Sequence, residues 1–126
     1  MEDKLDVLII DDDAGICETL ADIFTIVNFN VMVAYNGNTA LDIIKQKHVD
    51  VALIDMRMPG LNGVETLGRI KKIRPKIKAY IMTAYANDTL LEEAKKQGAI
   101  DIFFKPLNIT RLIESLKSFK KDYRKQ

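Results

Sequence analysis

The sequence predicts an α/β fold: a doubly wound, five-stranded parallel sheet of order 2-1-3-4-5 with helices on both faces. Apolar, strand-like runs alternate with helical patterns five times, with no linker or internal repeat between them. Strict alternation with short connections is typical of repeated βα units, whose right-handed crossovers build a parallel sheet. Two of the strands end in acidic residues, and this strand order puts the ends of those two, the first and the third, side by side.

Length and composition predict a single globular domain. The chain has 126 residues, and we expect one domain over residues 1–126, with its core at about 5–119 and a basic helical tail or linker at 120–126. Hydrophobic residues make up 48 % and charged residues 29 %, which is typical of a cytoplasmic protein. Aspartates soon interrupt the first apolar run, so we expect no secretory signal and no membrane span. The net charge of +1 argues against direct nucleic-acid binding.

The first two βα units are predicted in the N-terminal part of the chain. Residues 5–10 form the first strand, and the helix that follows ends near Asn28. Residues 31–35 form the second strand, residues 36–38 (Asn-Gly-Asn) a turn and cap, and the second helix closes at His48. The apolar positions of the two helices recur at helical spacing: Ile16, Leu20, Ile23, Phe24 and Val27, then Ala40, Leu41 and Ile44.

The remaining strands are predicted at residues 51–54, 78–82 and 101–104. Asn62 starts the third helix and Pro75 marks its end. The fourth helix, which Gly98 ends, has few apolar anchors, so we expect it to be the loosest. Asn108 caps a final amphipathic helix. The apolar positions of these helices are Val64, Leu67 and Ile70, then Leu90, Leu91 and Ala94, then Ile109, Leu112, Ile113, Leu116 and Phe119.

The polar residues at the strand ends are the strongest functional signal. Asp55 closes the third strand just before a Pro-Gly turn, and Asp11, Asp12 and Asp13 close the first. Because parallel strands end at the same edge of a sheet, Asp11, Asp12 and Asp55 are expected to cluster there. Thr83 and Lys105 reach that edge from the fourth and fifth strands.

Clustered carboxylates repel one another unless a cation joins them, and Mg²⁺ is the hard divalent ion that prefers such oxygen ligands. With Asp11 and Asp12 holding the metal, Asp55 is free to attack phosphorus and form an acyl phosphate. Lys105 would neutralise the phosphoryl oxygens together with Mg²⁺, and the Thr83 hydroxyl would hydrogen-bond one of them. The predicted site therefore performs phosphoryl transfer onto Asp55.

From about Leu5 to Phe119 the chain resembles the CheY-like receiver domains of two-component response regulators. The resemblance implies a phosphoryl group donated by the phosphohistidine of a histidine kinase or a histidine phosphotransfer protein. It also implies that Asp12 and Asp55 bind Mg²⁺ directly, Asp11 through water, and Arg57 through its backbone carbonyl. The motifs that carry the resemblance are Ile10-Asp11-Asp12-Asp13, Asp55-Met56-Arg57-Met58-Pro59-Gly60, Met82-Thr83-Ala84 and Phe104-Lys105-Pro106.

Three positions are expected to modulate the reaction. Ile102 stands where many receivers carry the aromatic residue that turns inward in the active state, and strand alternation sends Phe103 to the opposite face. Arg57 and Tyr85 lie two residues after Asp55 and Thr83, where their long side chains would shield the acyl phosphate from water. We therefore expect slow loss of phosphate from Asp55.

The resemblance also places the kinase beside the acidic cluster, where the start of the first helix meets the loop after Lys105. We expect a downstream effector or output domain as a further partner, and no membrane partner. The residues predicted to dock the kinase are Ala14, Gly15, Glu18, Pro106 and Leu107.

Two other functions remain open at this point. Asp11-Asp12-Asp13 fits the D-x-D pattern of haloacid-dehalogenase-type phosphatases, in which the first aspartate is the nucleophile, although Gly15 departs from the continuation of that pattern. A receiver that binds partners without being phosphorylated is the other alternative. Cys17 is expected to pack in the core and His48 to lie on the surface.

Overall fold

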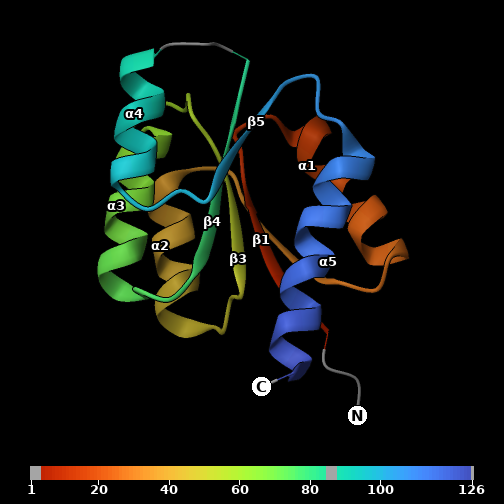
Figure 1. Ribbon diagram of the computed structural model, residues 1–126. Helices are drawn as coiled ribbons and strands as arrows, with labels where there is room; N and C mark the ends of the chain where they lie inside the picture. The colour runs from red at the N-terminus through yellow and green to blue at the C-terminus, as the bar shows by residue number, and fades with distance from the viewer. Residues whose placement is uncertain (1–3, 85–87, 126) are drawn as a thin grey trace.

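The computed structural model describes residues 4–84 and 88–125 and shows a five-stranded parallel sheet of order β2-β1-β3-β4-β5, as predicted (Figure 1). The strands are β1 (Asp6–Ile10), β2 (Asn30–Ala34), β3 (Val51–Asp55), β4 (Lys78–Thr83) and β5 (Asp101–Phe104). The helices are α1 (Ala14–Ile26), α2 (Gly37–Gln46), α3 (Gly63–Ile73), α4 (Asp88–Lys96) and α5 (Ile109–Lys125). Within the described residues, no helix has both the length and the apolar character needed to cross a membrane.

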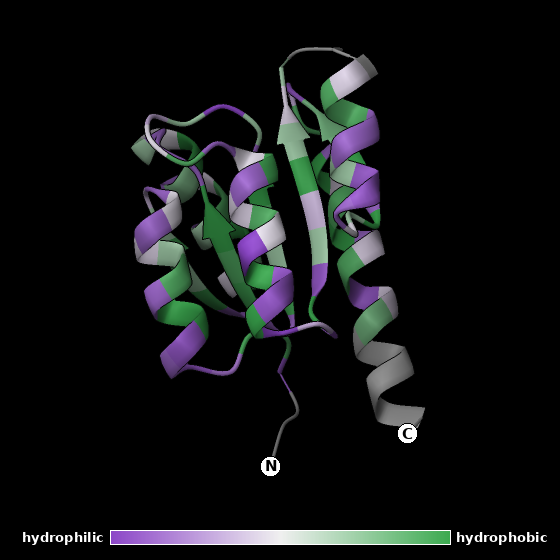
Figure 2. Cartoon of the chain, turned by 90° about the vertical axis from the view of Figure 1, so that its left-hand side faces the viewer, coloured by the Kyte–Doolittle hydropathy of each residue, from purple (hydrophilic) through white to green (hydrophobic). Residues whose placement is uncertain are grey.

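The helices cover the sheet in two layers, with α2, α3 and α4 on one face and α1 and α5 on the other (Figure 1). Successive strand residues point to opposite faces, so the core divides into two clusters. Leu8 and Ile54 pack under α2 and α3, whereas Val7 and Leu53 pack under α1 and α5. Figure 2 shows the strands as largely hydrophobic and the helices as mixed. The alternation also separates Ile102 from Phe103, as predicted from the sequence.

Several strand boundaries differ from the predicted ones by one residue. β1 begins at Asp6, which is the first residue of the strand to pair with β2 and lies opposite Asn30. β2 ends at Ala34, which leaves Tyr35 outside the ladder and 50 % exposed. Asp55 is the last residue of β3 and pairs with Met82, and β4 continues to Thr83. The acidic residue is therefore held by the ladder itself.

Side-chain caps fix where the helices begin. The amides of Asn36 and Asn62 accept backbone hydrogen bonds at the starts of α2 and α3, and Asn62 forms a capping box with Glu65. Asn108 accepts from the backbone N–H of Arg111 at 3.1 Å. Asp13 caps α1 in the same way, a role that the sequence did not reveal. Each cap satisfies backbone donors that a helix start leaves unpaired.

Cys17 is completely buried, as expected for a packing residue. Burial, together with the negative charges of Asp11 and Asp13, raises the pKa of its thiol to about 11. The thiol is therefore protonated near neutral pH and is a poor nucleophile.

His48 lies on the surface, as expected, but its imidazole contacts two carboxylates that face each other at the starts of β1 and β3. Nδ1 is 2.8 Å from Asp6 Oδ2, and Nε2 is 3.3 Å from Asp50 Oδ1. The hydrogen bond to Asp6 raises the pKa of His48 above its ordinary value of 6.5, with burial and the positive charge of Arg74 opposing and Asp50 supporting the shift. The imidazole thus joins residues at the starts of two neighbouring strands.

We expect His48 to make stability depend on pH. Because the folded pKa is raised, the stabilisation is fully present below the unfolded pKa of about 6.5 and disappears as the pH rises through the folded pKa. His48→Gln should therefore lower the free energy of unfolding at about pH 5.5 and have little effect at about pH 8.5. Urea unfolding of both proteins at the two pH values measures this, and a difference independent of pH would contradict the interpretation.

Candidate functional site

Carboxylates from two neighbouring strands meet at the carboxyl edge of the sheet. Asp11 follows β1 directly, and its backbone N–H donates to Ala34 O at 3.1 Å, which fixes the chain just beyond the strand. Asp55 ends β3, the neighbour of β1. Asp11, Asp12 and Asp55 each offer a ligand atom, and these atoms lie within 4.8 Å of one another. The structure thus brings together the three carboxylates that the sequence predicted to cluster.

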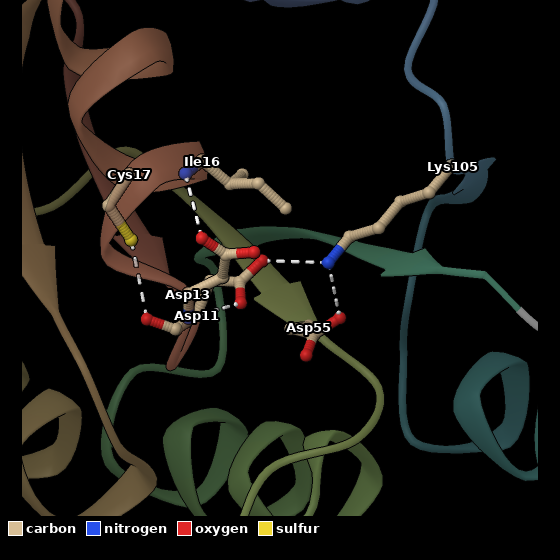
Figure 3. A network of polar contacts seen from close by, with 6 residues as sticks. All are labelled: Asp11, Asp13, Ile16, Cys17, Asp55 and Lys105. Atoms are coloured by element: carbon tan, nitrogen blue, oxygen red, sulfur yellow. Dashed lines mark hydrogen bonds and ion pairs between the residues drawn. The ribbon is translucent and has the colours of Figure 1, made fainter.

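Lys105 joins two of these carboxylates (Figure 3). Its Nζ lies 2.9 Å from Asp11 Oδ2 and 3.0 Å from Asp55 Oδ1. The backbone N–H of Lys105 donates to Thr83 O at 2.7 Å, so pairing between β4 and β5 continues up to the site. Four strands therefore contribute to the group: β1, β3, β4 and β5.

The group carries more negative than positive charge. Burial raises the pKa of Asp55, and the charges of Asp11 and Asp12 raise it further, while the Lys105 ammonium acts in the opposite direction. Burial alone would lower the pKa of Lys105, but hydrogen bonds to Asp11 and Asp55 reverse this and raise it. Lys105 is thus held protonated between carboxylates that it does not fully neutralise, and this local environment favours a further cation.

Asp11 is held on both carboxylate oxygens and is completely buried. Oδ1 accepts the backbone N–H of Asp13 at 3.0 Å, and Oδ2 accepts from Lys105. The Cys17 thiol donates to the backbone oxygen of Asp11 at 3.3 Å. This fixed position is suited to orienting a ligand and poorly suited to nucleophilic attack, which disfavours Asp11 as the reacting group.

The structure locates most of the other predicted residues. Thr83 is the last residue of β4 and is buried, while Arg57 is exposed in the loop after β3. Ile102 is buried in β5 on the face that α2, α3 and α4 cover. Tyr85 lies outside the described residues, so its predicted shielding role stays a prediction.

A pocket of about 530 Å³ lies beside the acidic group, between the start of α1 and the loop after β5. Three of the predicted docking residues line it, Gly15, Pro106 and Leu107, and the bond between Lys105 and Pro106 is cis. Ala14 and Glu18 are exposed on α1 but are not among the lining residues. Besides Asp13 and Lys105 of the acidic edge, four residues that were not predicted to dock the kinase line the pocket. They are Ile16, Thr19 and Leu20, whose spacing marks one face of α1, and Ile109 on α5.

The start of α3 packs directly against the backbone that carries Asp55. The Gly63 N–H donates to Met56 O at 2.9 Å. A Cβ atom at Gly63 would overlap the backbone oxygen of Asp55 and lie 2.8 Å from Met56 Cα. The absence of a side chain at Gly63 therefore sets how the loop returns from the acidic edge into α3.

A second group that has metal-ligand atoms, Asp6, His48 and Asp50, lies at the opposite edge of the sheet. The imidazole of His48 already occupies the space between the two carboxylates. These contacts account for the group without a metal.

A family model described as the response regulator receiver domain matches residues 7–117. Sporulation initiation phosphotransferase F of Bacillus subtilis is 37 % identical over 113 residues, which cover 90 % of this chain and 91 % of that protein. The transcriptional regulatory protein ZraR of Salmonella typhimurium is 40 % identical over 114 residues. These residues cover 90 % of this chain but only 26 % of ZraR, so the chain spans about a quarter of that relative.

Among solved structures, a response regulator receiver domain protein (CheY-like) from Methanospirillum hungatei JF-1 superposes with a TM-score of 0.92. It is 28 % identical to this chain, and the match covers 97 % of this chain and 98 % of that one. The similarity therefore extends through the sheet and the helices on both faces.

Proposed function

The chain belongs to the response regulator receiver domain family of two-component systems, and from that membership we propose that its Asp55 accepts a phosphoryl group in a Mg²⁺-dependent reaction. The observation that carries the proposal is the convergence of Asp11, Asp12 and Asp55 within 4.8 Å, with Lys105 bridging two of them. Family membership also argues against the phosphatase alternative, in which Asp11 would be the nucleophile.

The donor atoms fit a hard divalent cation, because they are carboxylate oxygens whose negative charge exceeds that of the one ammonium among them. Asp11, Asp12, Asp55 and the backbone carbonyl of Arg57 would hold Mg²⁺. When bound, the metal supplies positive charge that offsets the charge of the phosphoryl oxygens. We expect this site to be used in the cytoplasm, where kinases have access to ATP.

Asp55, Lys105 and Thr83 have separate roles in the proposed phosphoryl transfer. A carboxylate oxygen of Asp55 attacks phosphorus, a P–O bond forms, and the P–N bond of the donor phosphohistidine breaks with its electron pair leaving on the imidazole. Lys105 Nζ, which lies 3.0 Å from Asp55 Oδ1, is positioned to donate a hydrogen bond to a phosphoryl oxygen and to stabilise its negative charge. The Thr83 hydroxyl, at the end of β4, would donate to another phosphoryl oxygen. Formation of this hydrogen bond by Thr83 would move the chain after β4 and so alter the surface at α4.

Acetyl phosphate with Mg²⁺ is expected to add one phosphoryl group to the protein, as seen by intact mass, with the modified peptide containing Asp55. Removal of Mg²⁺ by a chelator should prevent the addition, because the clustered carboxylates of Asp11, Asp12 and Asp55 then repel the negatively charged donor. Phosphate recovered on Asp11 would support the phosphatase instead. A correctly folded protein that is not labelled by any donor would support the binding-only alternative.

The phosphoryl donor is proposed to dock in the pocket between α1 and the loop after β5. The pocket borders Lys105 and has an apolar lining that includes Leu107 and Ile109. A partner helix that carries a phosphohistidine could therefore bury apolar side chains there while the histidine faces Asp55. Sporulation initiation phosphotransferase F, which is matched over 91 % of its length, is named a phosphotransferase, and this supports a role of this chain in phosphoryl transfer.

Thr19→Arg is expected to slow transfer from a phosphorylated histidine phosphotransfer protein by about tenfold or more, because it adds bulk and charge to the pocket wall. Thr19 is exposed, so the change removes no core contact. Thr25→Arg is the matched control, since Thr25 is exposed on the same helix but outside the pocket. Labelling by acetyl phosphate should be unaffected in both variants. If Thr19→Arg slowed both donors equally, the effect would lie in the site and not in docking.

A further inference from the structure

A cationic groove of about 890 Å³ lies at the edge of the sheet opposite the acidic site. It is bordered by the starts of β1, β3 and β4, by the end of α3 and by α5, at the lower end of the molecule in Figure 1. Among the described residues, its charged lining comprises the cations Lys71, Arg74, Lys76 and Lys78 and one carboxylate, Asp50, which the imidazole of His48 contacts. We call it the basal groove. Pockets of this size hold a small ligand or a short peptide segment.

The cations of the basal groove are not matched by carboxylates. None of the ion pairs formed among the described side chains includes Lys71, Arg74, Lys76 or Lys78. Burial lowers the pKa of Lys71, and the positive charge of Lys78 lowers it further. The groove therefore gathers like charges that repel one another, and an anion bound among them would relieve that repulsion.

Neutral contacts hold two of these cations in place. Lys71 Nζ donates to Ile77 O at 2.7 Å and to Pro75 O at 3.4 Å. Lys78 Nζ lies 5.9 Å from the centre of the Phe119 ring. These contacts orient the ammonium groups without cancelling their charge, so part of the ordering cost of binding an anion is already met.

We propose that the basal groove binds an acidic peptide segment of a partner protein. Carboxylates of the segment would lie among Arg74, Lys76 and Lys78, and an apolar side chain would pack against Ile77 and Phe119. The net charge of the chain is only +1, which favours a short acidic peptide over the continuous phosphate backbone of a nucleic acid.

The position of the groove allows it to act independently of phosphorylation. The groove lies at the amino ends of the strands and Asp55 at their carboxyl ends. A five-residue strand such as β3 spans about 16 Å at about 3.3 Å per residue, so one partner could hold the receiver here while another transfers phosphate. The groove would thus serve as an anchoring site that leaves the reactive edge open.

The test uses the full chain and a fluorescein-labelled peptide, Glu-Glu-Leu-Glu-Glu-Phe-Glu-Glu, with binding followed by anisotropy and by backbone amide chemical shifts. Arg74→Glu with Lys76→Glu should weaken binding by about tenfold or more, since both residues are exposed in the groove. Lys45→Glu with Lys96→Glu makes the same change in net charge at exposed positions outside the groove and should change binding by less than about twofold.

Chemical-shift changes confined to residues 48–50, 71–78 and 119 would support the proposal. Equal weakening by both double variants would show attraction to overall charge only and overturn it. Tighter binding of a single-stranded oligonucleotide that depends on Arg74 and Lys76 would assign the groove to nucleic acid and also overturn it. Absence of peptide binding at low salt would also overturn the proposal. Unchanged labelling of Asp55 by acetyl phosphate shows that the groove variant remains folded.

Discussion

Asp55→Asn is expected to abolish labelling by acetyl phosphate completely and, at the same time, to raise the free energy of unfolding. The loss of labelling follows because an amide is too weak a nucleophile to form the acyl phosphate. The gain in stability follows from the environment of Asp55, which is buried beside Asp11 and Asp12. Most substitutions of buried residues destabilise a protein, by roughly 1 kcal/mol, so the opposite sign is a specific expectation.

The sign follows from the raised pKa of Asp55. A folded pKa above the unfolded one means that ionisation of Asp55 is harder in the folded protein, so stability falls as the pH rises between the two values. Once the pH is above the folded pKa, the carboxylate is ionised and this cost is present in full. Asparagine keeps the shape of the side chain and removes the charge, and Lys105 still has Asp11 as its partner at 2.9 Å.

Urea unfolding in the presence of a chelator measures the effect, with Asp42→Asn, an exposed position on α2, as the matched control. Added Mg²⁺ should stabilise the parent protein more than Asp55→Asn, because a ligand that binds only the folded state stabilises it according to its affinity. If Asp55→Asn were less stable than the parent protein in the presence of chelator, the inferred repulsion among Asp11, Asp12 and Asp55 would be contradicted.

The strand order and the clustering of the carboxylates could be predicted because both follow from topology. Once the alternation of strands and helices is recognised, the common order of five-stranded doubly wound sheets makes the ends of β1 and β3 neighbours, and Asp11 and Asp55 come with them. The alternation within β5 likewise sent Ile102 and Phe103 to opposite faces, as predicted. These inferences need the period of the pattern, the handedness of the connections and the common strand order of five-stranded doubly wound sheets.

Roles within the acidic run could not be assigned in the same way. Asp11, Asp12 and Asp13 are chemically identical, yet Asp11 is buried against Lys105, Asp12 is exposed and Asp13 caps α1. The backbone direction after β1 decides which carboxylate faces the site, and that direction depends on how α1 packs. The same limit explains the strand ends, because register against a neighbour, and not residue type, ended β2 at Ala34.

Features that need two helices or a distant loop were also beyond the sequence. The pocket lined by Ile16, Thr19 and Ile109 exists because α1 and α5 share one face of the sheet. The basal groove likewise gathers Lys71, Lys78 and other cations from both sides of the loop between α3 and β4. In the linear sequence these lysines look like ordinary solvated charges, and only their shared lack of carboxylate partners distinguishes them.

Gly63→Ala is expected to destabilise the protein by about 3 kcal/mol and to slow labelling of Asp55 by about tenfold or more. The new methyl group would overlap the backbone oxygen of Asp55 and lie 2.8 Å from Met56 Cα. These are backbone atoms of a buried strand and its first loop residue, so they cannot move aside as a flexible side chain would. The displacement would pass directly to the residue that is proposed to be phosphorylated.

Gly68→Ala provides the control in the same helix. A methyl group there would meet only the end of the Gln97 side chain, at 3.0 Å, which can rotate away. Alanine also favours a helix interior over glycine by up to about 1 kcal/mol, so Gly68→Ala should be neutral or stabilising. Urea unfolding and the rate of labelling by acetyl phosphate, measured on both variants, separate the two positions. Equal behaviour of the two variants would mean that the loop between β3 and α3 can accommodate a side chain, and that Gly63 does not set the position of Asp55.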